Sequence, residues 1–195
     1  VRHFGTWLRE RHDIAFAHET GSFIAMTHAD GSAVDHQRIW AMLDEFFPAE
    51  MQRQTLVPGA AEALAALAES ADIVILTNLG DHCRDHRIEQ LAEHGIRHRV
   101  ETNQGGKGGP VARLVAEYGN PVTVFVDDLA THHESVAKHA PTVHRLHLVA
   151  EPAMAPQVPP AAHAHARIDD WGAARDWIAQ RFAADQPAIT EGISA

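Results

Sequence analysis

The sequence predicts an α/β protein with a Rossmann-like, three-layer α/β/α arrangement, in which helices cover both faces of a parallel sheet. Two short and almost entirely apolar runs, residues 73–76 (IVIL) and 122–126 (VTVFV), predict buried strands. Helical patterns, with apolar residues three and four positions apart, separate these runs. Such an alternation of strands and helices is typical of a parallel sheet.

The first fifty residues predict helices and irregular segments instead of this alternation. Two amphipathic helices are expected, with apolar positions that recur every three or four residues. These positions are Phe4, Trp7, Leu8, Ile39, Met42, Leu43 and Phe46. Asp35 is expected to cap the second helix, and the polar, glycine-containing residues 20–32 are expected to form a loop or short hairpin.

The alternation begins at Pro58, which is expected to start a helix. Besides the two buried strands, the expected elements are a helix ending at Gly95, a weaker strand at 97–102, a flexible loop at 105–109, a helix from Pro110, a helix at 134–139 and an edge strand at 143–149. Residues 150–166 are expected to form a loop, Asp170 to cap a last helix and residues 186–195 to fray.

Composition excludes several classes of function. The net charge is −10 with neutral histidines, which argues against nucleic acid and anionic membranes as partners because both attract a basic surface. No apolar run approaches the roughly 18 residues of a membrane span. Cys83 is the single cysteine, so no intramolecular disulfide can form, and a reducing cytoplasm is the simplest expectation. The sixteen histidines are mostly scattered among charged residues and are expected at the surface.

Polar residues follow three of the expected strands. Thr77-Asn78 ends the first buried strand, Lys107 lies in the loop after the weaker strand, and Asp127-Asp128 ends the second buried strand. Because ligands bind at the carboxyl ends of strands in an open parallel sheet, these residues are expected to meet at one rim. A hydroxyl, a lysine and two carboxylates are suited to phosphoryl transfer, with the carboxylates holding Mg²⁺.

Each of these residues also has a simpler interpretation. Thr77-Asn78 could be turn residues, Lys107 could be a solvated loop lysine, and Asp127-Asp128 could cap the next helix. The combination at consecutive strand ends favours the functional interpretation. Other motifs fail: His133-Glu134 does not continue into H-E-x-x-H, and the glycines around Lys107 complete no phosphate-binding loop.

Three segments together resemble motifs of the haloacid dehalogenase-like superfamily. They are ILTN at 75–78, GGKGGP at 105–110 and VFVDD at 124–128. The resemblance covers residues 56 to about 149. It implies that the Thr77 hydroxyl binds phosphate and Lys107 offsets charge in the transition state, both as catalytic residues, that Asn78 binds the substrate, and that Asp127 and Asp128 hold Mg²⁺.

The resemblance also implies a domain plan and an activity. Residues 1–12 and 54–185 would form the α/β core, residues 13–53 a small helical cap inserted near the N-terminus, and residues 186–195 a flexible tail. The implied activity is Mg²⁺-dependent hydrolysis of a small phosphorylated metabolite through an aspartyl-phosphate. Oligomeric state and substrate identity have no signal in the sequence.

Two departures from the family pattern matter. The first motif, D-x-D-x-[TV], which carries the nucleophile and the general acid, is absent. We expect it, and the first strand, to precede Val1 and to lie between the strands at 73–76 and 122–126. The second departure is His132, with His133 beside it, where relatives carry asparagine or aspartate four positions after the second aspartate.

The missing nucleophile leaves two other functions open. One is a non-catalytic relative that binds a phosphorylated ligand or partner. The other is a haloacid dehalogenase, which needs no metal and would leave the Asp127-Asp128 pair without a role.

Overall fold

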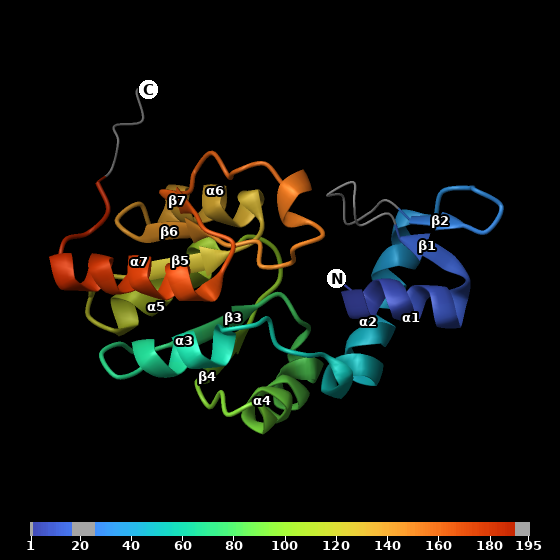
Figure 1. Ribbon diagram of the computed structural model, residues 1–195, viewed down its shortest axis with the longest axis horizontal. Coiled ribbons are helices and arrows are strands. Elements are labelled where there is room, and N and C mark those ends of the chain that lie inside the picture. Colours follow the sequence, from blue (N-terminus) through green and yellow to red (C-terminus); the bar gives the residue numbers. More distant parts are fainter. Residues whose placement is uncertain (1, 17–25, 190–195) are drawn as a thin grey trace.

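The α/β core has the alternating order of elements that the sequence predicts (Figure 1). The computed structural model describes residues 2–16 and 26–189. The core elements are α3 (Ala60–Leu67), β3 (Val74–Thr77), η3 (Asp81–Cys83), α4 (Arg84–Glu93), β4 (Arg99–Thr102), α5 (Gly108–Glu117), β5 (Val124–Asp127), α6 (Ala130–His139), β6 (His144–His147), η4 (Ala155–Gln157), β7 (Ala166–Arg167) and α7 (Trp171–Ala184).

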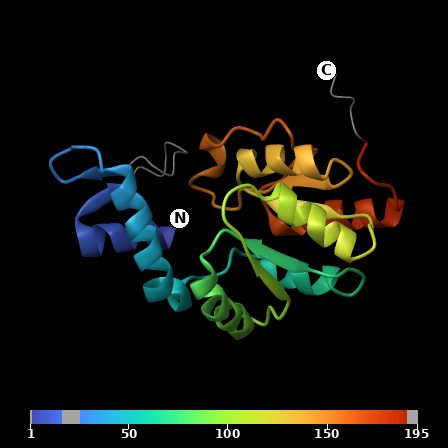
Figure 2. The same ribbon diagram turned by 180° about the vertical axis from the view of Figure 1, so that it is seen from behind.

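Helices cover both faces of the strands, so the three-layer prediction is confirmed. On one face α3 and α7 lie over the strands, in front in Figure 1, while α5 and α6 lie on the opposite face, in front in Figure 2. Successive side chains of a strand point to opposite faces. Accordingly, Phe125 packs with Val111 of α5 and Val136 of α6, whereas Val124 packs with Ile178 of α7.

A separate unit precedes this core. It consists of α1 (Arg2–His12), an antiparallel pair of strands β1 (Ile14–Phe16) and β2 (Met26–His28), and α2 (His36–Glu50), followed by η2 (Met51–Arg53). Its buried side chains form one cluster of their own, which includes residues from both helices and both strands. Helix α1, which the resemblance assigns to the core, therefore packs with α2; the division at 1–12, 13–53 and 54–185 stays a prediction.

A small cluster joins this unit to the core. Met51 of η2 packs against Leu79 and Cys83, and Phe47 of α2 contacts both this cluster and the cluster of the N-terminal unit. We call Phe47, Met51, Leu79 and Cys83 the joint. Leu79 directly follows the expected site residue Asn78, so the joint lies next to the candidate site in the chain.

Three residues were expected at helix starts, and the structure agrees with two of them, Asp35 and Asp170. Asp35 accepts hydrogen bonds from the amides of Gln37 and Arg38, and Asp170 accepts one from Ala173, so both predicted caps are present. Pro58 lies in a turn instead of a helix, because Gly59 takes a left-handed conformation (φ 78°) and α3 begins only after it. The expected loop at 20–32 falls partly on residues 17–25, outside the described residues.

The C-terminal part differs from the expectations in three details. The expected loop at 150–166 contains η4, and its end joins the sheet as β7, which pairs with β6. In the expected tail, the Ala188 amide donates to Thr142 and the Gln186 carbonyl accepts from His144, so residues 186–189 contact β6.

No helix among the described residues combines the length and apolar character needed to cross a membrane.

The sheet is divided into two parallel halves. Strand β3 pairs with β4 in one half, and β5, β6 and β7 pair in that order in the other. Within the described part of the chain, no strand pairs with the edge of β3 that faces β5, or with the edge of β5 that faces β3. This is the gap that we expected between the two central strands.

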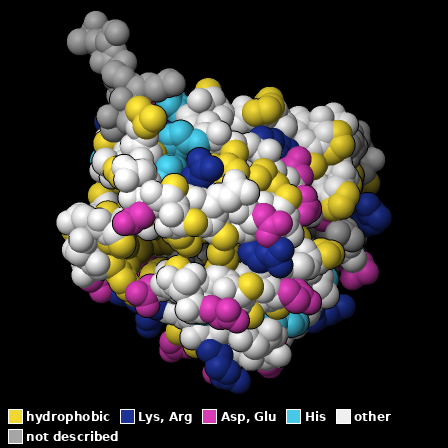
Figure 3. All heavy atoms as spheres, turned by 60° about the vertical axis from the view of Figure 1, so that its left-hand side comes forward, with side chains coloured by type: hydrophobic (Ala, Val, Ile, Leu, Met, Phe, Trp, Pro, Cys, Tyr) yellow, Lys and Arg dark blue, Asp and Glu magenta, His cyan; other side chains and the backbone are white. Residues whose placement is uncertain are grey.

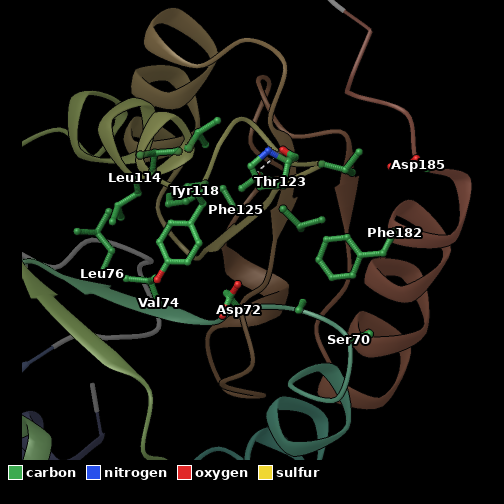
Figure 4. Close-up of a pocket in the computed structure, with 16 residues that line it drawn as sticks. Ser70, Asp72, Val74, Leu76, Leu114, Tyr118, Thr123, Phe125, Phe182 and Asp185 are labelled. Atoms are coloured by element: carbon green, nitrogen blue, oxygen red, sulfur yellow. Dashed lines mark hydrogen bonds between the residues drawn. The ribbon is translucent and has the colours of Figure 1, made fainter.

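A cavity of about 440 Å³ occupies the gap, and we call it the slot (Figure 4). It is lined by Val74 and Leu76 of β3, residues 122–125 around β5, side chains of α5 that include Leu114, Tyr118 directly after α5, and Phe182 of α7. The molecule is also hollowed on the face seen in Figure 3, where hydrophobic side chains are visible inside the hollow.

Backbone groups line the slot as well as side chains. The Thr77 carbonyl accepts from Asn103 after β4 at 2.9 Å, and the Asp127 carbonyl accepts from Leu148 after β6 at 3.0 Å. Because successive backbone groups of a strand point to opposite sides, the N–H and C=O of Leu76 and Val126 point into the gap between β3 and β5. Buried unpaired groups cost roughly 1–3 kcal/mol each. The free energy of unfolding of a whole domain is only about 5–15 kcal/mol. We therefore expect residues 1–195 to be unstable or prone to aggregation alone.

Native-state hydrogen exchange tests whether the slot-facing edges are unpaired. The amides of Leu76 and Val126 should exchange at least about tenfold faster than those of Thr77 and Asp127, which belong to the same strands but face β4 and β6. Residue-resolved exchange measured by NMR or mass spectrometry makes the comparison within one sample. Equal protection of the two sets would mean that the slot-facing edges are paired.

Candidate functional site

The carboxyl ends of β3, β4 and β5 lie together at one rim, as the sequence predicts. The side chain of Asn78, directly after β3, donates to the Gly105 carbonyl at 2.8 Å and accepts from the Asn103 side chain at 3.0 Å. Its amide nitrogen also lies 3.4 Å from Nε2 of His132 on α6. Asn78 therefore connects the ends of β3 and β4 with the helix that follows β5.

Lys107 and Asp127 form the central ion pair of this rim. Nζ of Lys107, directly before α5, lies 2.7 Å from Oδ2 of Asp127, the last residue of β5. The side chains are 12% and 5% exposed, respectively. The other oxygen of Asp127, Oδ1, accepts the Leu129 amide at 2.9 Å. Each carboxylate oxygen thus has a partner, and the interpretation of Lys107 as a solvated loop lysine is wrong.

Asp128 differs from Asp127 although the two are adjacent. Its side chain reaches solvent, and no ion pair joins it to a cation among the described residues. Loss of hydration near the surrounding protein raises the pKa of the Asp128 carboxyl, and the charge of Asp127 acts in the same direction. An exposed carboxylate that forms no ion pair is suited to bind a cation.

Thr77 ends β3 at the same rim with its side chain half buried. Its carbonyl accepts from Asn103, while its hydroxyl makes no hydrogen bond within residues 2–16 and 26–189. The structure thus brings Lys107 and Asp127 into contact and places Asn78 at the same rim. Among the described residues, the side chains of Thr77 and Asp128 form no hydrogen bond or ion pair with the other site residues.

The donor set fits Mg²⁺. This hard cation is usually held by one or two carboxylates, together with water and substrate phosphate oxygens. Asp127 and Asp128 supply such a carboxylate pair. No group of three or more His, Cys, Asp or Glu close enough to hold a metal occurs in the described ranges, so the side chains present could hold the ion only together with other oxygens.

The glycines around Lys107 allow α5 to begin close to α6. The Gly108 amide donates to Oγ of Ser135 on α6 at 3.0 Å, and a Cβ on Gly108 would lie 2.0 Å from the Ser135 carbonyl oxygen. Gly108 and Gly109 form the first turn of α5, so residues 105–109 are not a flexible loop throughout. This close packing fixes the point from which Lys107 reaches Asp127.

Sequence reasoning missed buried polar residues at this rim. His132 and His133 are 8% and 0% exposed, in contrast to the expectation of surface histidines, and burial lowers the pKa of both. The side chain of Asn103, which meets Asn78, was also missed. His133 lies three residues before the buried Val136, a helical spacing that could have indicated an inward position.

Comparison with known proteins supports the fold. No protein-family model matches the chain, and no curated protein matches its sequence. Among solved structures, the chain is similar to a haloacid dehalogenase-like family hydrolase from Xanthomonas campestris, with a TM-score of 0.54 and 16% sequence identity. The match covers 78% of this chain and 66% of that one. The chain therefore has a haloacid dehalogenase-like fold, as its motifs suggested.

Substitution of single glycines by alanine tests the packing that positions Lys107. Gly108→Ala should destabilise the protein by roughly 1–3 kcal/mol, because the new methyl group would overlap the Ser135 carbonyl. Gly109→Ala is the matched control: nothing lies within 4 Å of its Cβ position, so the better helix propensity of alanine should leave stability unchanged or about 1 kcal/mol higher. Urea denaturation of both variants measures the difference, and similar effects would contradict the close approach of α5 to α6.

Proposed function

We propose that the protein is a Mg²⁺-dependent phosphohydrolase of the haloacid dehalogenase-like type, with a small phosphorylated metabolite as its substrate. The observation that carries the proposal is the buried Lys107–Asp127 pair at the carboxyl end of β5, 2.7 Å apart. A buried cation beside a carboxylate pair is the arrangement that phosphoryl transfer requires, since the reaction needs positive charge around a phosphate.

Each residue of the rim has a role in this proposal. Asp127 and Asp128 would hold Mg²⁺, which would neutralise charge on the phosphate. The Thr77 hydroxyl and the Asn78 side chain would donate hydrogen bonds to phosphate oxygens. Lys107 would stabilise the charge that develops on the transferring group. With the metal bound, Lys107 would be released in part from Asp127 and become available to the phosphate.

The slot supports a place for the nucleophile. An extended strand between β3 and β5 would pair with both free edges and would end at the rim, beside Lys107 and Asp127. An aspartate at that end could attack phosphorus through a carboxylate oxygen, while the ester oxygen leaves with a proton from a general acid. Water would then hydrolyse the aspartyl-phosphate and regenerate the carboxylate. We expect this strand to carry the D-x-D motif and to precede Val1.

A binding protein without catalysis is the second candidate. It is favoured by one observation: the sequence contains no D-x-D motif. The same rim could then hold a phosphorylated ligand through Lys107, Thr77 and a bound cation without turning it over. A haloacid dehalogenase explains less, because its chemistry gives the Asp127-Asp128 pair no metal to hold.

Removal of the Lys107 charge tests Asp127 as a metal ligand without any substrate. Lys107→Ala leaves a buried carboxylate without a counter-charge, which should lower the metal-free stability by roughly 3–5 kcal/mol. Mg²⁺ should restore much of this loss, because the ion replaces the ammonium group beside Asp127. Thermal unfolding with EDTA and with millimolar Mg²⁺ measures both effects.

Lys138→Ala is the control, since Lys138 is the other lysine of the chain and is exposed on α6. It should change neither the stability nor the response to Mg²⁺. If Mg²⁺ fails to stabilise Lys107→Ala more than the control, Asp127 does not bind the ion.

Activity tests the nucleophile. Residues 1–195 should not hydrolyse generic phosphate esters with Mg²⁺, whereas a chain extended upstream by a D-x-D-bearing strand should do so. EDTA should abolish this activity and Mg²⁺ restore it, Asp127→Asn should sharply weaken the metal dependence, and Lys107→Ala should lower kcat by about 10²–10³. Metal-dependent turnover by residues 1–195 would refute a nucleophile outside them, and full activity in EDTA would favour a dehalogenase.

A further inference from the structure

Two fully buried histidines lie behind the acidic pair and have no role in the chemistry proposed above. His133 projects from α6 and His147 from the end of β6, and both are 0% exposed. Their rings contact each other edge to face, with centroids 5.3 Å apart, and His133 meets Phe125 in the same manner at 5.4 Å. Two imidazoles without solvent contact need a structural or functional reason, because burying a polar ring is costly unless it is hydrogen-bonded.

Both rings bond to the backbone of the acidic pair. Nε2 of His133 lies 3.0 Å from the carbonyl oxygen of Asp127, and Nε2 of His147 lies 3.0 Å from the carbonyl oxygen of Asp128. A carbonyl oxygen can only accept a hydrogen bond, so each Nε2 must carry a proton and donate it. Two consecutive carbonyls are thus held by two side chains from different elements.

The second nitrogen of His147 fixes its tautomer. Nδ1 accepts the backbone amide of Ala161 at 3.0 Å and lies 3.3 Å from a guanidinium nitrogen of Arg167. Since Nδ1 is an acceptor, the ring is neutral and its single proton is on Nε2. Nδ1 of His133 has no hydrogen-bond partner among the described residues, so the bond to Asp127 is the polar contact that accounts for the position of this ring.

We propose that His133 and His147 are positioning residues, which hold the backbone turn of Asp127-Asp128 so that both carboxylates face the rim. Adjacent carboxylates repel each other, and a free turn could separate them by rotation of one residue. The two imidazole bonds oppose this rotation before a cation is present. The inference rests on the proposed function where it concerns the metal; the hold on the turn itself does not depend on it.

The first test is hydrogen exchange in metal-free protein. The Leu129 amide, which donates to Oδ1 of Asp127, reports whether the turn is intact. His133→Leu should accelerate its exchange about tenfold, the size expected for the loss of one hydrogen bond, whereas His133→Gln, which keeps an N–H donor, should restore most of the protection. Val136→Ala is the control: it shortens a fully buried side chain of the same helix that packs in a hydrophobic cluster with Val111 and Phe125, so it should lower the melting temperature without selective exchange at Leu129.

The second test is the affinity for Mn²⁺ alone, a hard cation that electron paramagnetic resonance can follow. His133→Leu should weaken binding about tenfold relative to the wild type, His133→Gln should bind nearly as well, and Val136→Ala should be unchanged. If the wild type itself binds no Mn²⁺, the metal part of the proposed function fails, while the exchange at Leu129 still decides whether the histidines hold the turn.

The tautomers are measured on the wild type by long-range ¹⁵N NMR of the imidazole rings, which requires no variant to fold. Protons on Nε2 of both His133 and His147 are expected. A proton on Nδ1 of either ring would overturn the inference. Equal effects of His133→Leu and Val136→Ala on Leu129 exchange would overturn it as well, because the histidine would then contribute only general stability.

Discussion

A central strand of a sheet needs a hydrogen-bonded neighbour on each side, and the rest of this structure depends on that constraint. Strands β3 and β5 each have one paired edge and one edge on the slot. The two halves of the sheet are therefore held together by helices: α3 packs on α7 across one face and α5 on α6 across the other. Because these helices cover both faces, the slot is bounded by the two unpaired strand edges and by side chains of the covering helices, which is where we propose that a further strand would pair.

The charges of the rim are arranged across the same division. Lys107 directly precedes the helix that follows β4, whereas Asp127 belongs to β5, so their ion pair joins the two halves of the sheet at the carboxyl end. In a surrounding of low polarity neither charge is tolerated alone. Stability and the proposed chemistry would therefore depend on the same two side chains, whereas Asp128 forms no ion pair among the described residues and is the carboxylate proposed to meet the metal first.

Local signals in the sequence predicted the strands, the caps and the residues at strand ends, because each depends on a few neighbouring positions. Asp35 and Asp170 cap helices as expected. The partner of Lys107 could not be predicted, since it depends on the packing of Gly108 against Ser135 in another helix. The burial of His133 was not predicted, because most of the histidines are scattered among charged residues and were expected at the surface. Its helical spacing from Val136 was the one indication of an inward position.

Strand β7 was missed for another reason: two residues are too short for any periodic pattern, and β7 is held in place by pairing with β6. The short element thus depends on the sheet and contributes little to its formation. The packing partner of α1 could not be predicted either. Its sequence pattern shows an apolar face but does not indicate which unit covers that face.

The joint has a mechanical consequence for the rim. The N-terminal unit has its own hydrophobic cluster, so it can tilt as a body without losing its interior. Such a tilt would act on Leu79, the residue after Asn78, because Phe47 and Met51 pack in the same cluster as Leu79. Asn78 in turn is tied to Gly105 and Asn103. A change in the orientation of the N-terminal unit is therefore expected to shift Asn78 and, with it, the shape of the rim.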